Sequence, residues 1–93
     1  MRGQLRQIEQ RLRRVRQQIG RGRLARLPEA LRQYAVTGQV PADSVVAAYV
    51  KLNTAALRAM EASVSQEGYE AAVEAYQQAL DGWRRALRGG GHE

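Results

Sequence analysis

The clearest helical pattern in the chain lies at residues 69–88, which read YEAAVEAYQQALDGWRRALR. Large apolar residues recur there at alternating intervals of four and three residues, the spacing of one face of an α-helix. Acidic residues come early and arginines come late, an order that complements the helix dipole. The stretch therefore predicts a long helix that ends near Arg88 and packs through one face. The residues of that face are Tyr69, Val73, Tyr76, Leu80, Trp83 and Leu87.

The preceding stretch predicts a second long helix with the same spacing. It starts near Asp43, whose carboxylate is suited to cap a first turn, and it runs to about Val64. One position of its apolar row is polar. This residue, Asn53, either specifies the register of packing or lies at the rim in contact with water. The predicted row is Val46, Val50, Asn53, Leu57, Met60 and Val64, and the residues that widen its face are Val45, Tyr49, Leu52 and Ala56.

Only residues 65–68 connect these two helices, so we expect them to pair as an antiparallel hairpin. In the later helix, aromatic and small residues stand at Tyr69, Ala72, Tyr76 and Ala79. That order resembles the second helix of a tetratricopeptide repeat, but the preceding helix departs from the family. A single repeat cannot bury its own apolar face, so we interpret the hairpin as the body of a small bundle.

A shorter amphipathic helix is predicted at residues 4–19, before the glycines at positions 20 and 22. Its apolar residues alternate at intervals of three and four, as in a coiled coil. About two and a half heptads are too few to hold an isolated helix. The row must therefore pack on the rest of the chain or on a second copy. It consists of Leu5, Ile8, Leu12, Val15 and Ile19.

The last predicted helix is short, at residues 28–36, where Pro28 suits a first turn and Gly38 follows the end. Together the patterns predict an all-α fold, a small helical bundle with an antiparallel helical hairpin body and a basic N-terminal coiled-coil-like helix. We expect three regions. These are residues 1–26, a basic amphipathic helix with a glycine–arginine hinge, residues 27–88, the helical body, and residues 89–93, a flexible glycine-rich tail.

Charge divides the chain into a basic arm and a mildly acidic body. Residues 1–26 hold nine arginines and one glutamate, a net charge of +8, whereas residues 27–93 hold six basic and eight acidic residues, a net charge of −2. The formal net charge of the chain is +6. Such an arm favours an anionic partner, which is nucleic acid (DNA or RNA) or an acidic protein. The sequence leaves open that the arm instead folds back onto acids of its own body.

Most arginines of the arm lie outside the apolar row, so the helix can pack through that row and present guanidinium groups to a phosphate backbone. Arg21, Gly22 and Arg23 extend the charge into an expected flexible loop, and this Arg-Gly-Arg resembles the core of an AT-hook. We predict recognition of shape and charge without sequence readout, because the aromatic residues occupy packed faces. The candidate nucleic-acid-binding residues are Arg6, Arg11, Arg13, Arg14, Arg16, Arg21 and Arg23.

Residues that carry most enzymatic chemistry are scarce in this chain. It has no cysteine, which excludes thiolate chemistry, and its one histidine, His92, offers little basis for an acid–base or metal site. Glu67, Glu70 and Glu74 share one helix face, which is typical of a solvated surface. We therefore predict a protein that is not an enzyme, with no catalytic residues, no metal site and no cofactor.

Two other functions remain open. The first is a helical adaptor or oligomerisation subunit, which binds protein partners through its heptad rows without nucleic-acid contact. The second is a helix on a membrane surface, but the narrow N-terminal row lacks Trp and Phe and follows coiled-coil spacing, which favours protein packing. We expect a cytoplasmic homo-oligomer or subunit of a complex, without membrane association. No apolar run reaches the length of a membrane span, and the N-terminal residues lack the apolar core of a signal peptide.

Overall fold

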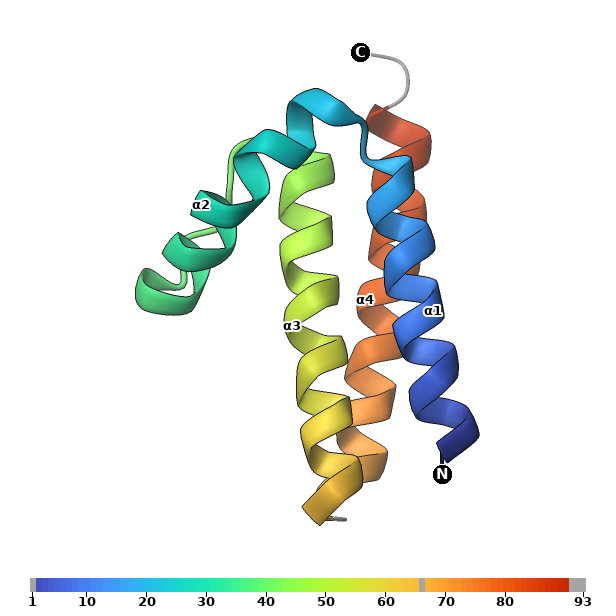
Figure 1. Cartoon of the computed structure of the whole chain (residues 1–93). Helices are drawn as coiled ribbons and strands as arrows, with labels where there is room; N and C mark the ends of the chain where they lie inside the picture. The colour runs from blue at the N-terminus through green and yellow to red at the C-terminus, as the bar shows by residue number, and fades with distance from the viewer. Residues whose placement is uncertain (1, 66, 91–93) are drawn as a thin grey trace.

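The computed structural model describes residues 2–65 and 67–90, with side chains described at 6–65 and 67–89. Within these residues the chain forms four helices and no strand, which confirms the predicted all-α bundle (Figure 1). The helices are α1 (Arg2–Gln18), α2 (Arg21–Thr37), α3 (Ser44–Ser65) and α4 (Tyr69–Gly90).

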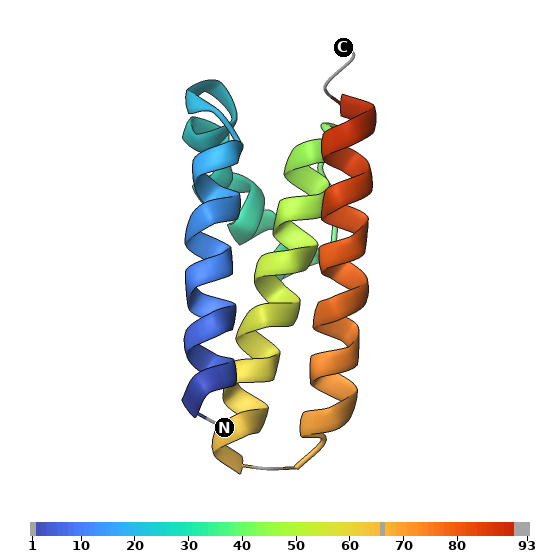
Figure 2. The same ribbon diagram turned by 90° about the vertical axis from the view of Figure 1, so that its right-hand side faces the viewer.

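Three of the helices run along the long axis of the molecule. α3 and α4 lie side by side as an antiparallel hairpin, and α1 packs beside them, antiparallel to α3 and parallel to α4 (Figures 1 and 2). α2 leaves the end of α1, crosses the start of α3 and then slants away from the other helices (Figure 1). The bundle therefore consists of three helices that run side by side, α1, α3 and α4. The fourth helix, α2, covers only part of α3.

The predicted face of α4 lies in the core. Tyr76, Leu80 and Trp83 are buried, which agrees with the spacing in the sequence. Trp83 meets Tyr49 of α3 edge to face, with ring centroids 6.1 Å apart and ring planes at 72°. Such an aromatic pair adds about 0.5–1.5 kcal/mol to the stability that burial provides. The half-buried residues of the same face are Tyr69, Val73 and Leu87.

On α3 the packed row lies one residue earlier than the predicted central row, and its first four members are the residues that the sequence predicts to widen the face. A shift of one residue turns a helix by about 100°, so the predicted row forms a neighbouring face. At the start of that face Val46 and Val50 are buried, but further along Leu57 is 49% exposed and Val64 is 85% exposed. The row that faces the core consists of Val45, Tyr49, Leu52, Ala56, Ala59 and Ser63.

The position of α2 explains why the neighbouring face is buried over half its length. α2 covers the beginning of α3 and then slants away, whereas α1 and α4 continue along α3 (Figure 1). The expectation that Leu57 packs in a helix interface is therefore wrong within this chain. Asn53 and Met60 are half-buried at the edge of the core.

The apolar row of α1 packs within its own chain, against α3. Ile8, Val15 and Ile19 are each no more than 5% exposed, and Leu12 is half-buried against the same core. The remaining residue of the predicted row, Leu5, lies outside the residues whose side chains are described. The sequence left open whether this row packs on its own chain or on a second copy. In the structure it packs on its own chain.

α2 begins at Arg21, well before the predicted start at Pro28. Gly20 separates the two helices with a φ of 89°, a value that favours glycine, so residues 21–23 form the first turn of α2 and not a flexible loop. Pro28 then lies inside the helix, where it removes one backbone hydrogen bond. Burial of Leu27, at 2% exposed, supports the helix across this position. The residues that resemble an AT-hook core are therefore helical, not extended.

Glycines also mark the predicted ends of α2, at Gly38, and of α4, after Arg88, and the structure agrees with the first end only. α2 ends where the sequence predicts, and Gly38, with a φ of 72°, donates its backbone N–H to the carbonyl oxygen of Tyr34 at 2.9 Å. α4 continues through Gly90, so the first two residues of the predicted tail are helical. Residues 91–93, which include the histidine, lie outside the described residues.

Candidate nucleic-acid interface

The helix α1 has one packed face and one charged face. Ile8 and Val15 are buried, whereas Arg6, Arg13 and Arg14 lie at least a third of a turn away from Ile8 and are exposed. Packing of the apolar row on α3 therefore turns the arginines outward. The arginines that flank the packed face, also exposed, are Arg11 and Arg16.

The arginines of α1 whose side chains are described, from Arg6 to Arg16, have no ion-pair partner among the described residues. Among the side chains of residues 6–65 and 67–89, ion pairs form between Arg23 and Asp43 and between Arg84 and Asp81, and neither involves α1. The one acidic residue of α1, Glu9, is itself exposed. From Arg6 to Arg16 the charged face extends over about 15 Å of the helix axis.

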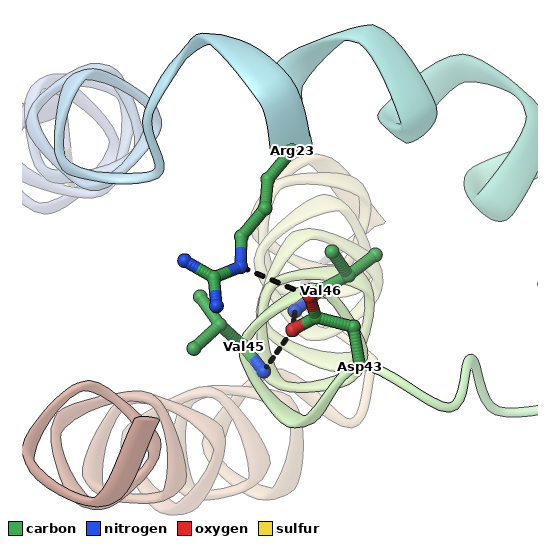
Figure 3. Close-up of polar contacts among 4 residues, drawn as sticks. All are labelled: Arg23, Asp43, Val45 and Val46. Atoms are coloured by element: carbon green, nitrogen blue, oxygen red, sulfur yellow. Dashed lines mark hydrogen bonds and ion pairs between the residues drawn. The ribbon is translucent and has the colours of Figure 1, made fainter. Parts of the chain in front are cut away.

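Arg23 is held differently, at the junction of α2 and α3 (Figure 3). Its Nε donates a hydrogen bond to Oδ2 of Asp43 at 3.0 Å. The other carboxylate oxygen, Oδ1, accepts hydrogen bonds from the backbone N–H groups of Val45 at 2.9 Å and Val46 at 3.2 Å. Asp43 thus caps α3, as the sequence predicts, and in addition joins the first turn of α2 to the first turn of α3.

These contacts change the acidity of the capping carboxyl group. Burial alone would raise the pKa of Asp43, but the hydrogen bonds from Arg23 and from the backbone of Val46 and Val45 outweigh it. The pKa of Asp43 is therefore lowered from its ordinary value of 3.8. The charged form of this group is the form that stabilises the junction.

Arg23 therefore differs from the other candidate phosphate ligands, because its guanidinium group is already engaged within the chain. The pair joins residues that are 20 positions apart on different helices, so no spacing rule could have found it. The one usable signal was that an N-capping aspartate carries a negative charge. Arg21, on the same turn of α2, remains exposed.

A groove of about 230 Å³ lies between α1 and α4. Figure 2 shows these two helices from the side on which both face the viewer, with α3 behind them. The lining is mixed, because apolar and aromatic side chains are accompanied by two amides and a guanidinium group. From α1 these include Gln7, Ile8 and Arg11, and from α4 they include Tyr69, Tyr76 and Gln77.

Two arginines from different helices act electrostatically on Tyr76, a residue of the groove lining. Burial raises the pKa of the Tyr76 hydroxyl, and the charges of Arg11 and Arg84 oppose that shift. Arg11 lines the groove itself, whereas Arg84 does not.

Most aromatic side chains are occupied by packing, as the sequence predicts. Tyr49, Tyr76 and Trp83 are each less than 10% exposed, and so their ring faces are unavailable to a stacked base. Tyr34 packs half-buried against the core from α2. Tyr69 is half-buried at the wall of the α1–α4 groove.

No group of three His, Cys, Asp or Glu side chains lies close enough together to hold a metal ion in the part of the chain that the structure describes. Over the same residues, no helix combines the length and apolar character needed to cross a membrane.

Comparison of the chain with known protein families, with curated proteins and with solved structures finds no match. The charge, exposure and packing of the residues themselves therefore indicate what the protein can bind.

Proposed function

We propose that this protein is a small, non-enzymatic, cytoplasmic accessory protein that binds the phosphate backbone of nucleic acid inside a larger assembly. One observation carries the proposal. α1 packs its apolar face on α3 and holds its arginines from Arg6 to Arg16 on exposed positions, with no acidic partner among the described residues. Folding back of the arm onto its own body is seen at one pair of described residues, Arg23 with Asp43.

Exposed arginines on a rigid helix suit phosphate binding for two physical reasons. A guanidinium group stays charged across the physiological pH range and can donate two parallel hydrogen bonds to one phosphate. Each phosphate that is neutralised also releases condensed counterions, which drives association at low salt. Because phosphates are alike along every sequence, such contacts favour recognition of charge and shape without sequence readout.

The proposed surface extends from α1 onto the start of α2. Arg21 adds a charge beyond the turn at Gly20, and it is exposed like the arginines of α1. Arg23 is not included, because its Nε is bound to Asp43. The proposed phosphate ligands are Arg6, Arg11, Arg13, Arg14, Arg16 and Arg21.

The test is a fluorescence anisotropy titration of labelled duplex DNA and single-stranded RNA across a salt series. We expect the logarithm of the affinity for duplex DNA to fall linearly with the logarithm of the salt concentration, by about 0.9 per phosphate contact. The double variant Arg13→Glu/Arg14→Glu replaces two attractive charges by repulsive ones. It should weaken binding by about tenfold or more and flatten the salt dependence.

A matched control changes the same amount of charge elsewhere. Lys51 and Arg58 are both exposed on α3, so Lys51→Glu/Arg58→Glu alters the net charge equally without touching α1. We expect this control to weaken binding far less than the α1 variant. Absence of binding to either nucleic acid at low salt would contradict the proposed function, and an equal loss in both variants would contradict the role of α1.

The alternative function is a helical adaptor or oligomerisation subunit, and one observation favours it. The face of α3 that starts with buried Val46 and Val50 continues to Leu57 and Val64, which are exposed. An apolar row that is covered over half its length is suited to the helix of an acidic partner or of a second copy.

Sedimentation velocity over a range of protein concentrations tests the adaptor alternative as self-association. An oligomer should sediment faster than a monomer and should dissociate in a Leu57→Lys/Val64→Lys variant. A monomer at every concentration would contradict self-association through this face.

A further inference from the structure

The hairpin of α3 and α4 has an open side, opposite to the side that α1 covers. On α4, Gln77 lines the groove with α1, whereas Ala75 lines two further grooves together with residues of α3. Two residues turn a helix by about 200°, so these grooves lie on nearly opposite sides of α4. The two further grooves measure about 290 and 530 Å³, and Tyr34 of α2 reaches one edge of the smaller. Lys51 and Ala75 line both, so the two form one continuous channel, here called the open groove.

The two walls of the open groove differ in shape and in charge. From α3 it is lined by two long basic side chains, Lys51 and Arg58, which are both exposed. From α4 the described lining consists of alanines, one glycine and Gln78. Small residues on a helix let a neighbouring helix come close. The α3 wall therefore presents projections, and the α4 wall presents the space that receives projections.

Glutamates follow the outer edge of the α4 wall. Ala72 is half-buried against the core, so Glu70, which lies about 100° to the other side of Ala71, is on the side away from α3. Glu74 has the same relation to Ala75. Both glutamates are exposed, and neither they nor the basic residues of the α3 wall take part in an ion pair among the described side chains. One edge of the open side is thus basic, the other is acidic, and the chain itself pairs neither.

We propose that the open groove binds the open groove of a second copy of this chain, in a dimer whose two-fold axis runs parallel to α3 and α4. This axis places α3 of each copy over α4 of the other, so projections meet small residues and basic edges meet acidic edges at both halves of the interface. A two-fold axis in the same plane but perpendicular to the helices would place α3 on α3 and bring the basic side chains together. Charge therefore selects the parallel axis.

The heights of the residues along the hairpin fit this axis. Lys51 and Ala75 line the open groove together, and so do Arg58 and Ala71. A two-fold axis parallel to the helices preserves height, so Lys51 of each copy meets Ala75 of the other, and Arg58 meets Ala71. Each basic side chain lays its apolar stem over an alanine and extends its charge to the glutamate that precedes that alanine.

The dimer goes beyond the proposed function and does not depend on it. The two hairpins form a four-helix bundle, and α1 of each copy stays on the outside, because α1 covers the side of the hairpin opposite to the open groove. The arginine faces of the two α1 helices therefore lie on opposite surfaces of the dimer. A short duplex meets one face at a time, so loss of the dimer in Lys51→Glu/Arg58→Glu should change its affinity little.

Sedimentation velocity over a range of protein concentrations, at low salt and without nucleic acid, is the first test. We expect a reversible change from monomer to dimer as the concentration rises. A monomer at every concentration up to about 0.5 mM would overturn the proposal. It would leave phosphate binding by α1 untouched, whereas failure to bind nucleic acid would leave the dimer untouched.

A charge exchange across the interface is the second and sharper test. Lys51→Glu/Arg58→Glu makes both edges acidic, and Glu70→Lys/Glu74→Lys makes both edges basic, so each variant alone should be a monomer. An equimolar mixture should form a heterodimer, because the acidic edges of one variant then meet the basic edges of the other. Each pair of substitutions shifts the formal net charge of +6 by four units, so both variants stay positive and net charge opposes their association. Two variants that stay monomeric in the mixture, or that dimerise alone, would overturn the pairing.

Two further variants separate this interface from other surfaces. Ala75→Gln places a longer side chain in the middle of the open groove and should weaken dimerisation about tenfold. Ala25→Gln makes the same change at an exposed position of α2 and should have no effect. Leu57→Lys/Val64→Lys alters the other exposed face of α3 and should leave the dimer intact. Dissociation by the last variant, with no effect of Ala75→Gln, would assign the dimer to that other face. Circular dichroism should show a folded helical protein in each case, because every substituted position is exposed.

Discussion

α1 and α2 are both helices of 17 residues and share the arginines of the basic arm, yet they use them differently. α1 attaches to α3 through an apolar row and leaves its arginines from Arg6 to Arg16 exposed. α2 attaches through Leu27 and through the ion pair between Arg23 and Asp43. Composition therefore does not separate the arginines that stabilise the fold from those that remain exposed. Contact with one carboxylate, that of Asp43, separates them.

The largest expected effect tests how the two helices are anchored. Leu27→Ala should lower the free energy of unfolding by about 2–5 kcal/mol, because Leu27 is 2% exposed and its removal leaves a cavity. Leu12→Ala on α1 should cost less, since Leu12 is only half-buried. Urea unfolding followed by circular dichroism measures both variants. Equal losses would show that α2 is no more firmly anchored at Leu27 than α1 is at Leu12.

The next effect isolates the capping carboxylate. Asp43→Ala should lower the free energy of unfolding by about 1 kcal/mol, because the backbone N–H groups of Val45 and Val46 lose their acceptor. Asp81→Ala is the control, since its ion pair with Arg84 lies on the surface and contributes little. If Asp43→Ala and Asp81→Ala unfold at the same urea concentration, the junction of α2 and α3 is not held by Asp43.

A smaller effect separates the two arginines on the first turn of α2. Arg23→Gln should lower the free energy of unfolding by at most about 1 kcal/mol, because solvent screens this half-exposed ion pair. Arg21→Gln should leave stability unchanged but weaken nucleic-acid binding, since Arg21 is exposed. Urea unfolding measures the stability of both variants, and fluorescence anisotropy measures their affinity for nucleic acid. The reverse result would mean that the structural and exposed arginines have been assigned the wrong way round.

The smallest effect is a pH dependence of the same junction. Because the pKa of Asp43 is lowered on folding, the unfolded chain binds the proton more readily. The stability that Asp43 contributes is therefore present at neutral pH and is lost as the pH falls below the ordinary value of 3.8. The difference in stability between wild type and Asp43→Ala should be constant above about pH 5 and should shrink as the pH falls below 3.8. A difference that persists unchanged in acid would exclude the charged carboxylate as its source.

Much of the fold could be predicted because its signals are local. The row from Tyr69 to Leu87 lies on one side of α4, and Asp43 caps α3 as its position before an apolar run indicates. Gly38 ends α2 through a left-handed backbone conformation that glycine adopts without strain. In each case the residues that form the feature are neighbours along the chain.

The features that sequence reasoning missed depend on distant contacts. The start of α2 was placed too late, because Gly22 and Pro28 disfavour a helix locally, whereas burial of Leu27 against the core favours it. The same limit applies to Arg11, which lines a groove with Tyr76 and Gln77 of another helix. Local propensity cannot weigh a contact whose partner lies far along the chain.

The amino-acid sequence by itself determined the helical class, the apolar row of α1, the packed face of α4, the cap at Asp43 and the charge of the N-terminal arm. Only the tertiary structure decided which of two adjacent rows on α3 faces the core, and which arginine of the arm is bound internally. α3 has apolar residues on both rows, so its own periodicity allows either, and the positions of α1, α2 and α4 select one. Likewise Arg21 and Arg23 share a turn of α2, and only the placement of Asp43 at the start of α3 distinguishes them.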